Sequence, residues 1–83
     1  MSQSHLVSVI VRLKPGVLDP QGKAVETALI GMGHDQISNL RQSKLFEFTV
    51  TAASSAEAEE KAKAMATDLL ANTVIENFEI KVA

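Results

Sequence analysis

The sequence predicts a small α+β domain made of two layers, an antiparallel sheet and a pair of helices. Three observations predict it: apolar residues alternate in several short stretches, two amphipathic segments follow helix-start signals, and the two kinds of segment are interleaved along the chain. The chain has 83 residues, which corresponds to one domain near the lower size limit for independent folding. We therefore expect a single domain over residues 1–83.

The first expected strand covers residues 6–13. One face carries an apolar series of alternating residues, Val7, Val9, Val11 and Leu13. The opposite face carries Leu6 and Ile10, so it is also partly apolar. These side chains are either scattered surface residues, which are common, or the contact of a second subunit.

A connection rich in proline and glycine follows this strand and leads into a helix. Pro15-Gly16 is typical of a turn, because proline presets φ and glycine accepts a positive φ. Asp19 is the expected N-cap and Pro20 the first helical residue. The helix places one apolar stripe toward the sheet, Val25, Ala28, Leu29 and Met32. Gly33 is the expected left-handed cap at its end.

Two strands joined by a hairpin are expected next. Residues 36–41 form a weaker strand, in which a bulge near Ser38-Asn39 would return Ile37 and Leu40 to one face. Gln42-Ser43 would be the turn, although it is a poor turn dipeptide. Residues 44–51 then form a strand with Phe46, Phe48 and Val50 on one side.

The second helix begins at Ser54, which forms a capping box with Glu57. Its expected apolar stripe is narrow and consists of Ala58, Ala62, Met65 and Leu69. Asn72-Thr73 ends the helix, and a last strand alternates through residues 78–82. The order is therefore β-α-β-β-α-β, a ferredoxin-like sandwich with both helices on one face of the sheet. The other face, with Leu6, Ile10 and Leu45, would be suited to covering by a second sheet.

Composition and charge exclude several classes of function. The net charge is −2 and there is no cysteine, which argues against nucleic-acid binding, disulfides and thiolate chemistry. No spacing typical of a metal site is present, and no stretch approaches the roughly 20 apolar residues of a membrane helix. The polar segment from Met1 to His5 has no apolar run behind a basic region, so a signal peptide is not expected. We expect a cytoplasmic protein that binds neither nucleic acid nor membrane.

No catalytic constellation is visible. An acyl-phosphate site could be built from Lys14, Asn39 and Arg41, but the loop after the first strand lacks a run of phosphate-facing N–H groups. Base stacking on the sheet is disfavoured because Phe46 and Phe48 are assigned to the core. A free-standing dimeric regulatory domain that binds a small metabolite at its dimer interface remains an alternative.

Three stretches of the chain resemble one known family. Residues 13–26, from Leu13-Lys14-Pro15-Gly16 to Ala24-Val25-Glu26, closely resemble the hallmark segment of PurS, the small subunit of phosphoribosylformylglycinamidine (FGAM) synthase. Residues 40–44 resemble the family's Val-Arg-x-Gly-Lys hairpin, and residues 70–76 its turn into the last strand. Two departures occur: Ser43 replaces the usual glycine, and Thr73 replaces a frequent proline.

The resemblance implies a subunit without an active site of its own. In that family a glutaminase subunit releases ammonia from glutamine, and a large synthetase subunit uses ATP and Mg²⁺ to convert formylglycinamide ribonucleotide to the amidine. The small subunit needs no cofactor and bridges the two others, assisting ammonia transfer in purine biosynthesis. It is expected as a homodimer, or as a tetramer in isolation.

A partner-facing surface is expected around the hallmark segment. Its predicted residues are Lys14, Pro15, Gly16, Asp19, Gln21, Gly22, Arg41 and Lys44. Alternatively, this segment only fixes the angle between the strand and the helix. Neither interpretation assigns a catalytic residue or a metal ligand.

Overall fold

The protein combines one antiparallel sheet with two helices and a short π-helical turn. The computed structural model describes residues 2–83, so Met1, part of the expected 1–83 domain, lies outside the described residues. The elements are β1 (Gln3–Leu13), α1 (Pro20–Gly31), β2 (Ser43–Ala52), α2 (Ser55–Met65), η1 (Ala66–Leu70) and β3 (Glu76–Val82). The α+β class and the order of these elements are as predicted.

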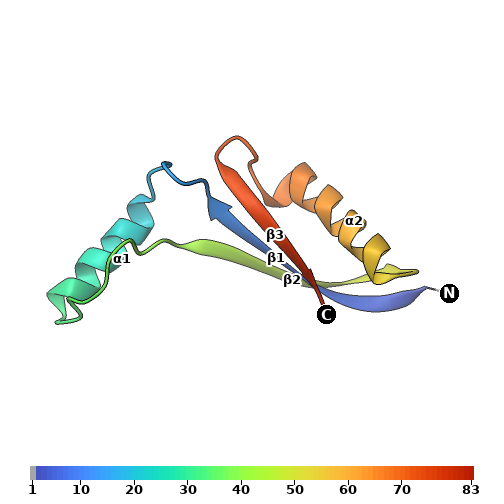
Figure 1. The fold of residues 1–83 in the computed structure, drawn as a ribbon, viewed down its shortest axis with the longest axis horizontal. Coiled ribbons are helices and arrows are strands. Elements are labelled where there is room, and N and C mark those ends of the chain that lie inside the picture. The colour runs from blue at the N-terminus through green and yellow to red at the C-terminus, as the bar shows by residue number, and fades with distance from the viewer. Residues whose placement is uncertain (1) are drawn as a thin grey trace.

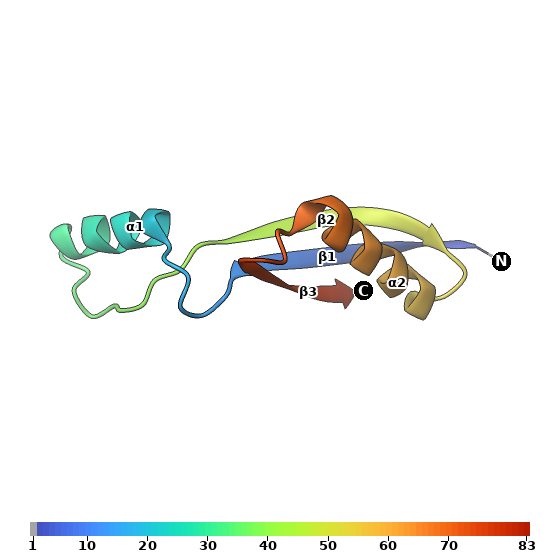
Figure 2. The same cartoon turned by 90° about the horizontal axis from the view of Figure 1, so that it is seen from above.

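The sheet has three strands in the order β2-β1-β3, and both pairings are antiparallel. Val9 of β1 lies opposite Phe46 of β2 and opposite Ile80 of β3. Helix α2 lies across one face of the sheet (Figures 1 and 2). The central strand is therefore the one with the cleanest apolar alternation in the sequence.

The core lies between β1 and α2. Val7, Val9 and Val11 are almost completely buried, as their alternation predicts. The facing residues of the helical layer are equally buried alanines, Ala58, Ala62 and Ala66. Because alanine side chains are short, α2 can lie close to the sheet. The Ser54 N-cap is confirmed, because the Glu57 amide donates to Ser54 Oγ at 3.2 Å. The return bond of the predicted capping box is displaced by one residue: Glu57 Oε2 accepts from the Ala53 amide at 3.2 Å.

The predicted stripe of the second helix is wrong at its C-terminal end. Met65 is 39% exposed and Leu69 is 85% exposed, whereas Ala66 is buried. Met65 precedes η1 and lies beside the buried positions Ala58, Ala62 and Ala66, which are four residues apart. For Leu69 the cause is η1, in which the Ala71 amide donates to the Ala66 carbonyl at 2.9 Å, an i to i+5 bond. A π-helical turn rotates the following residues relative to α-helical spacing. Leu69 therefore points away from the core.

The strand predicted over residues 36–41 and its hairpin do not form. The chain runs from this segment into β2 without a reversal, and Asn39 has a φ of 57°. Gln42-Ser43 supplies no residue suited to the positive φ that a two-residue hairpin needs. The amides of Leu40 and Gln42 instead donate to side-chain carboxylates of the α1 segment. The sheet consequently has three strands rather than four.

Helix α1 does not cover the sheet, contrary to the prediction. With residues 32–42 it forms an arm that projects beyond the sheet (Figures 1 and 2). The Cα radius of gyration is 16.3 Å, whereas a compact chain of this length has about 12 Å. Val25, Ala28 and Met32 are consequently exposed, and only Leu29 of the predicted stripe is half-buried. Within residues 2–83, no helix combines the length and apolarity needed to cross a bilayer.

Candidate functional site: the junction between sheet and arm

The junction is the region where residues 14–26 meet residues 40–44. Asp19 is its central side chain and is 8% exposed. Its carboxylate accepts from the Gly22 amide at 2.9 Å, which confirms the predicted N-cap, and from the Gln42 amide at 2.8 Å. These two hydrogen bonds, with Gln42 contributing more, and the nearby Arg41 charge lower the pKa of Asp19. The carboxylate is therefore ionised at neutral pH.

Glu26 makes a second contact between α1 and the returning chain. Its Oε1 accepts from the Leu40 amide at 3.1 Å, and its Oε2 pairs with Lys23 Nζ at 3.1 Å. The Leu40 hydrogen bond, followed by that of Lys23, lowers the pKa of Glu26. Asp19 and Glu26 are seven residues apart and so lie on the same side of the helix. Together they hold residues 40–42 along α1.

The glycines of the hallmark segment have different roles. Gly16 has a φ of 88°, as the predicted Pro15-Gly16 turn requires. Gly22 allows close packing: a Cβ there would lie 2.5 Å from Asp19 Oδ2 and 2.9 Å from the Leu40 carbonyl oxygen. No side chain larger than hydrogen fits between α1 and residue 40 without a shift of the backbone.

The basic residues of the junction stay at its surface. The Arg41 guanidinium donates to the Lys14 carbonyl at 3.4 Å, and Lys44 Nζ lies 3.9 Å from Glu76 Oε2. The Lys14 amide donates to the Ile75 carbonyl at 2.8 Å, which ties the connection to the start of β3. Arg41 is exposed, and the Lys44 side chain is 65% exposed although its partner Glu76 is largely buried. Both cations are therefore accessible to a partner.

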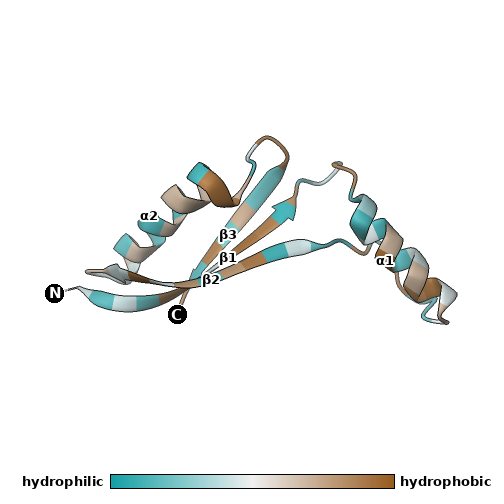
Figure 3. Ribbon diagram, turned by 180° about the vertical axis from the view of Figure 1, so that it is seen from behind, coloured by the Kyte–Doolittle hydropathy of each residue, from teal (hydrophilic) through white to brown (hydrophobic). Residues whose placement is uncertain are grey.

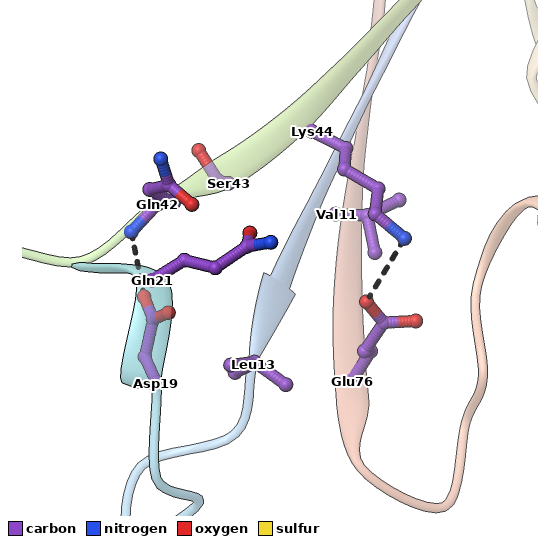
Figure 4. A pocket seen from close by; sticks show the side chains of 8 residues that line it. All are labelled: Val11, Leu13, Asp19, Gln21, Gln42, Ser43, Lys44 and Glu76. Carbon is purple, nitrogen blue, oxygen red and sulfur yellow. Dashed lines mark hydrogen bonds and ion pairs between the residues drawn. The ribbon is translucent and has the colours of Figure 1, made fainter. Parts of the chain in front are cut away.

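Two open hollows flank the junction. The larger has a volume of about 420 Å³ and is lined mainly by polar side chains, as Figure 4 shows: Asp19, Gln21, Gln42, Ser43, Lys44 and Glu76, together with the apolar Val11 and Leu13. The smaller, of about 350 Å³, lies beside Pro15 and Arg41. Both combine polar and apolar side chains, which suits contact with another protein surface.

All the predicted interface residues lie in this one region, although they come from segments separated by about twenty residues of sequence. Sequence reasoning missed Glu26, which lies off the predicted apolar stripe of the helix, and did not include Gln42, Ser43 and Glu76. The signal for Glu26 was its spacing of seven residues from Asp19, which places two carboxylates on one side of the helix. Whether the surface contacts a partner stays a prediction.

The junction has no arrangement typical of catalysis. Its two buried carboxylates, Asp19 and Glu26, each accept hydrogen bonds from backbone amides. In the described part of the chain, no group of three His, Asp or Glu side chains is placed to hold a metal ion. The junction can therefore recognise another surface through hydrogen bonds and a complementary shape.

Comparison with known proteins decides the family. The family model described as "PurS: Phosphoribosylformylglycinamidine (FGAM) synthase" matches residues 6–83. The chain belongs to the PurS family. A PurS subunit of FGAM synthase from Synechocystis sp. is 44% identical over 78 residues, which cover 94% of this chain and 78% of the relative. The resemblance inferred from the hallmark segment is thereby confirmed.

Solved PurS structures share the fold of this chain, including its separate arm. The Bacillus subtilis PurS structure has a TM-score of 0.83 at 40% identity and covers 95% of this chain and 98% of its own. A chain in the structure of PurLQS from Thermotoga maritima has a TM-score of 0.90 at 26% identity, with 98% and 99% coverage. Since these matches span nearly the whole chain, they include both the sheet and α1.

Proposed function

We propose that this chain is the small, non-catalytic subunit of FGAM synthase in de novo purine biosynthesis. The observation that carries the proposal is the family match over residues 6–83. The PurLQS structure, which contains a chain of the same fold, supports an assembled role. In this role the chain bridges the glutaminase and synthetase subunits in the cytoplasm.

The proposed role includes assistance to ammonia transfer between those subunits. Ammonia is largely protonated in neutral water and then has no lone pair for attack. A sheltered route from glutaminase to synthetase keeps it in its nucleophilic form. A subunit that fixes the relative position of the two enzymes serves this purpose without chemistry of its own. ATP and Mg²⁺ would be used by the synthetase subunit, and this chain would need no cofactor.

Docking at the junction is the part of the proposal that concerns individual residues. The carboxylates of Asp19 and Glu26 fix the position of residues 40–42, and Arg41 and Lys44 stand at the surface beside them. A rigid backbone with two accessible cations is well suited to an acidic partner surface, because little ordering is needed on binding. The alternative of a metabolite-binding regulator gains no support from the hollows, which are open.

Charge reversal tests the docking surface. Arg41→Glu and Lys44→Glu are each expected to reduce capture of the glutaminase and synthetase subunits in a pull-down by about tenfold or more. Lys63→Glu, an exposed reversal on α2, is the matched control and should leave capture unchanged. Unchanged capture by both junction variants, with intact circular dichroism, would remove the junction from the interface.

Function as a whole is tested by deleting the gene. Growth that depends on added purine, restored by the intact gene, is expected. Normal growth without purine would contradict the synthase assignment and would leave the metabolite-binding regulator as the better interpretation.

A further inference from the structure

The smaller hollow beside the junction, of about 350 Å³, is cationic. Its lining consists of Arg12, Leu13, Pro15, Arg41, Gln42 and Ser43. Arg12 and Arg41 are the only arginines in the sequence, and both border this one hollow. None of the carboxylates within residues 2–83 is part of the lining, although the whole chain carries a net charge of −2. A local positive site in an acidic chain favours a negatively charged ligand.

The two guanidiniums reach the hollow from different parts of the fold. Arg12 lies directly opposite Ser43 in the β1–β2 ladder, so their side chains share one face of the sheet. Arg41 comes from the segment before β2, and its Nη2 donates to the Lys14 carbonyl at 3.4 Å. Figure 3 shows hydrophilic positions where β1 ends and β2 begins. The hollow is therefore formed by the pairing of β1 with β2 and by the chain entering β2.

Both guanidiniums retain hydrogen-bond donors for a ligand. Arg12 Nη1 donates to Glu79 Oε2 at 3.1 Å, in an ion pair whose side chains are 57% and 49% exposed. Each arginine thus uses one of its three side-chain nitrogens in hydrogen bonds within residues 2–83. A guanidinium has five N–H donors in a fixed planar arrangement. The contact with Glu79 also identifies a carboxylate as a group that Arg12 binds.

We infer that this hollow receives the side-chain carboxylate of an aspartate or glutamate on a partner subunit. The inference rests on the proposed function and names the group that the junction recognises. One guanidinium can donate two parallel hydrogen bonds to the two oxygens of a carboxylate, and the second adds donors from another direction. The Ser43 hydroxyl supplies a further donor, and Leu13 and Pro15 offer apolar contact to the methylene groups of the incoming side chain.

The exposure of the lining favours a carboxylate delivered by a protein surface over a small free anion. Arg12, Pro15, Arg41 and Ser43 are all exposed. A free anion bound there would remain in contact with water, where ion pairs are weak. A docked surface excludes water from the hollow and so strengthens the same hydrogen bonds.

Substitutions that conserve charge test the requirement for two guanidiniums. Arg12→Lys and Arg41→Lys keep the positive charge but lose the paired donors. Each should raise the dissociation constant of the full chain from the mixed glutaminase and synthetase subunits by about fivefold to tenfold. Lys63→Arg, an exposed exchange on α2, is the matched control and should bind as the wild type does. Circular dichroism should be the same for all three variants.

Glu79→Gln separates ligand binding from a structural role of Arg12. The substitution removes the carboxylate that competes for Arg12, so partner binding should be unchanged or tighter. If Arg12 acted only by holding Glu79, Glu79→Gln would weaken binding as much as Arg12→Lys does, and the inference would be wrong. Titration of the isolated chain with inorganic phosphate provides another test. Saturable shifts of both arginine Nε–H signals in nuclear magnetic resonance spectra would assign the hollow to a free phosphate group and overturn the inference.

The inference and the proposed function fail separately. Loss of capture by Arg41→Glu, together with wild-type binding by Arg12→Lys and Arg41→Lys, would keep the docking surface but reject the carboxylate site. Growth of the deletion strain without purine would instead reject the enzyme complex itself.

Discussion

The two halves of this molecule are held together by different interactions. The sheet and α2 enclose three valines and three alanines that are almost inaccessible to water. The arm has no comparable core, and its described tertiary contacts include backbone amides bound to the carboxylates of Asp19 and Glu26. Burial of apolar side chains therefore stabilises the sheet with α2, whereas hydrogen bonds to two carboxylates hold the arm in position. The shape of the arm therefore depends on two carboxylates, whereas the shape of the sheet half depends on side-chain packing.

The largest effect is expected from a cavity in the sheet half. Val9→Ala removes two methyl-sized groups from a site with no exposed surface and should lower the free energy of unfolding by about 2–3 kcal/mol. Urea denaturation followed by circular dichroism measures the change. Val74→Ala, at a position that is 80% exposed, should remain within about 0.5 kcal/mol of the wild type. Equal effects at both positions would contradict the assigned core.

A smaller effect is expected from crowding the arm. Gly22→Ala forces a Cβ against the Asp19 carboxylate and the Leu40 carbonyl, so it should destabilise the arm by about 1–3 kcal/mol. Gly31→Ala is the matched control, because a Cβ there meets nothing within 4 Å and should stabilise by about 0.5–1 kcal/mol. Amide hydrogen exchange at Leu40 and Gln42 reports on the arm. Unaltered exchange in Gly22→Ala would show that the contact is not tight.

The smallest and most local effect is expected from acid. Hydrogen bonds lower the pKa values of Asp19 and Glu26 beneath their ordinary values of 3.8 and 4.5. The arm binds fewer protons when it is closed, so its stabilisation is complete above those ordinary values and is lost as the pH falls through the lowered pKa values. The protection factors of the Gln42 and Leu40 amides against hydrogen exchange should fall there, while that of the Val9 amide stays high.

Variants separate the two carboxylates in this acid response. Asp19→Asn should remove the pH dependence at Gln42, and Glu26→Gln should remove it at Leu40. Glu59→Gln on α2 is the control and should alter neither. Simultaneous loss of protection at Val9 and Gln42 in the wild-type protein would mean that the arm does not open separately from the sheet.

The parts of the fold that sequence predicts well are those fixed by local chemistry. Alternation identified the buried side of β1, and Asp19-Pro20 and Ser54 located the starts of both helices because caps act within a few residues. The errors arose where distant residues compete. Nothing local to residues 36–42 reveals that carboxylates of the α1 segment accept hydrogen bonds from the Leu40 and Gln42 amides. The alanine-rich sequence likewise does not reveal the π-helical turn that exposes Leu69.

The candidate site was likewise predicted where its signals are local and missed where they depend on residues far apart in sequence. The hallmark segment identified the family and most of the junction, since its prolines and glycines act locally. Glu26 and Glu76 were not recognised because their partners, Leu40 and Lys44, lie far along the chain. The position of α1 could not be predicted from its apolar stripe, because the stripe shows which side of the helix is apolar but not where in the fold that side lies.

The position of β1 between β2 and β3 has a consequence for the order of folding. β1 is synthesised before both of its neighbours, and Val7 lies opposite Val82, so the pairing of β1 with β3 must wait until residues 76–82 have been made. Until then one edge and the valine face of β1 stay open to unwanted pairing. The arm, whose contacts are closer in sequence, can close earlier. A partly made chain is therefore most exposed to mispairing before residues 76–82 are available.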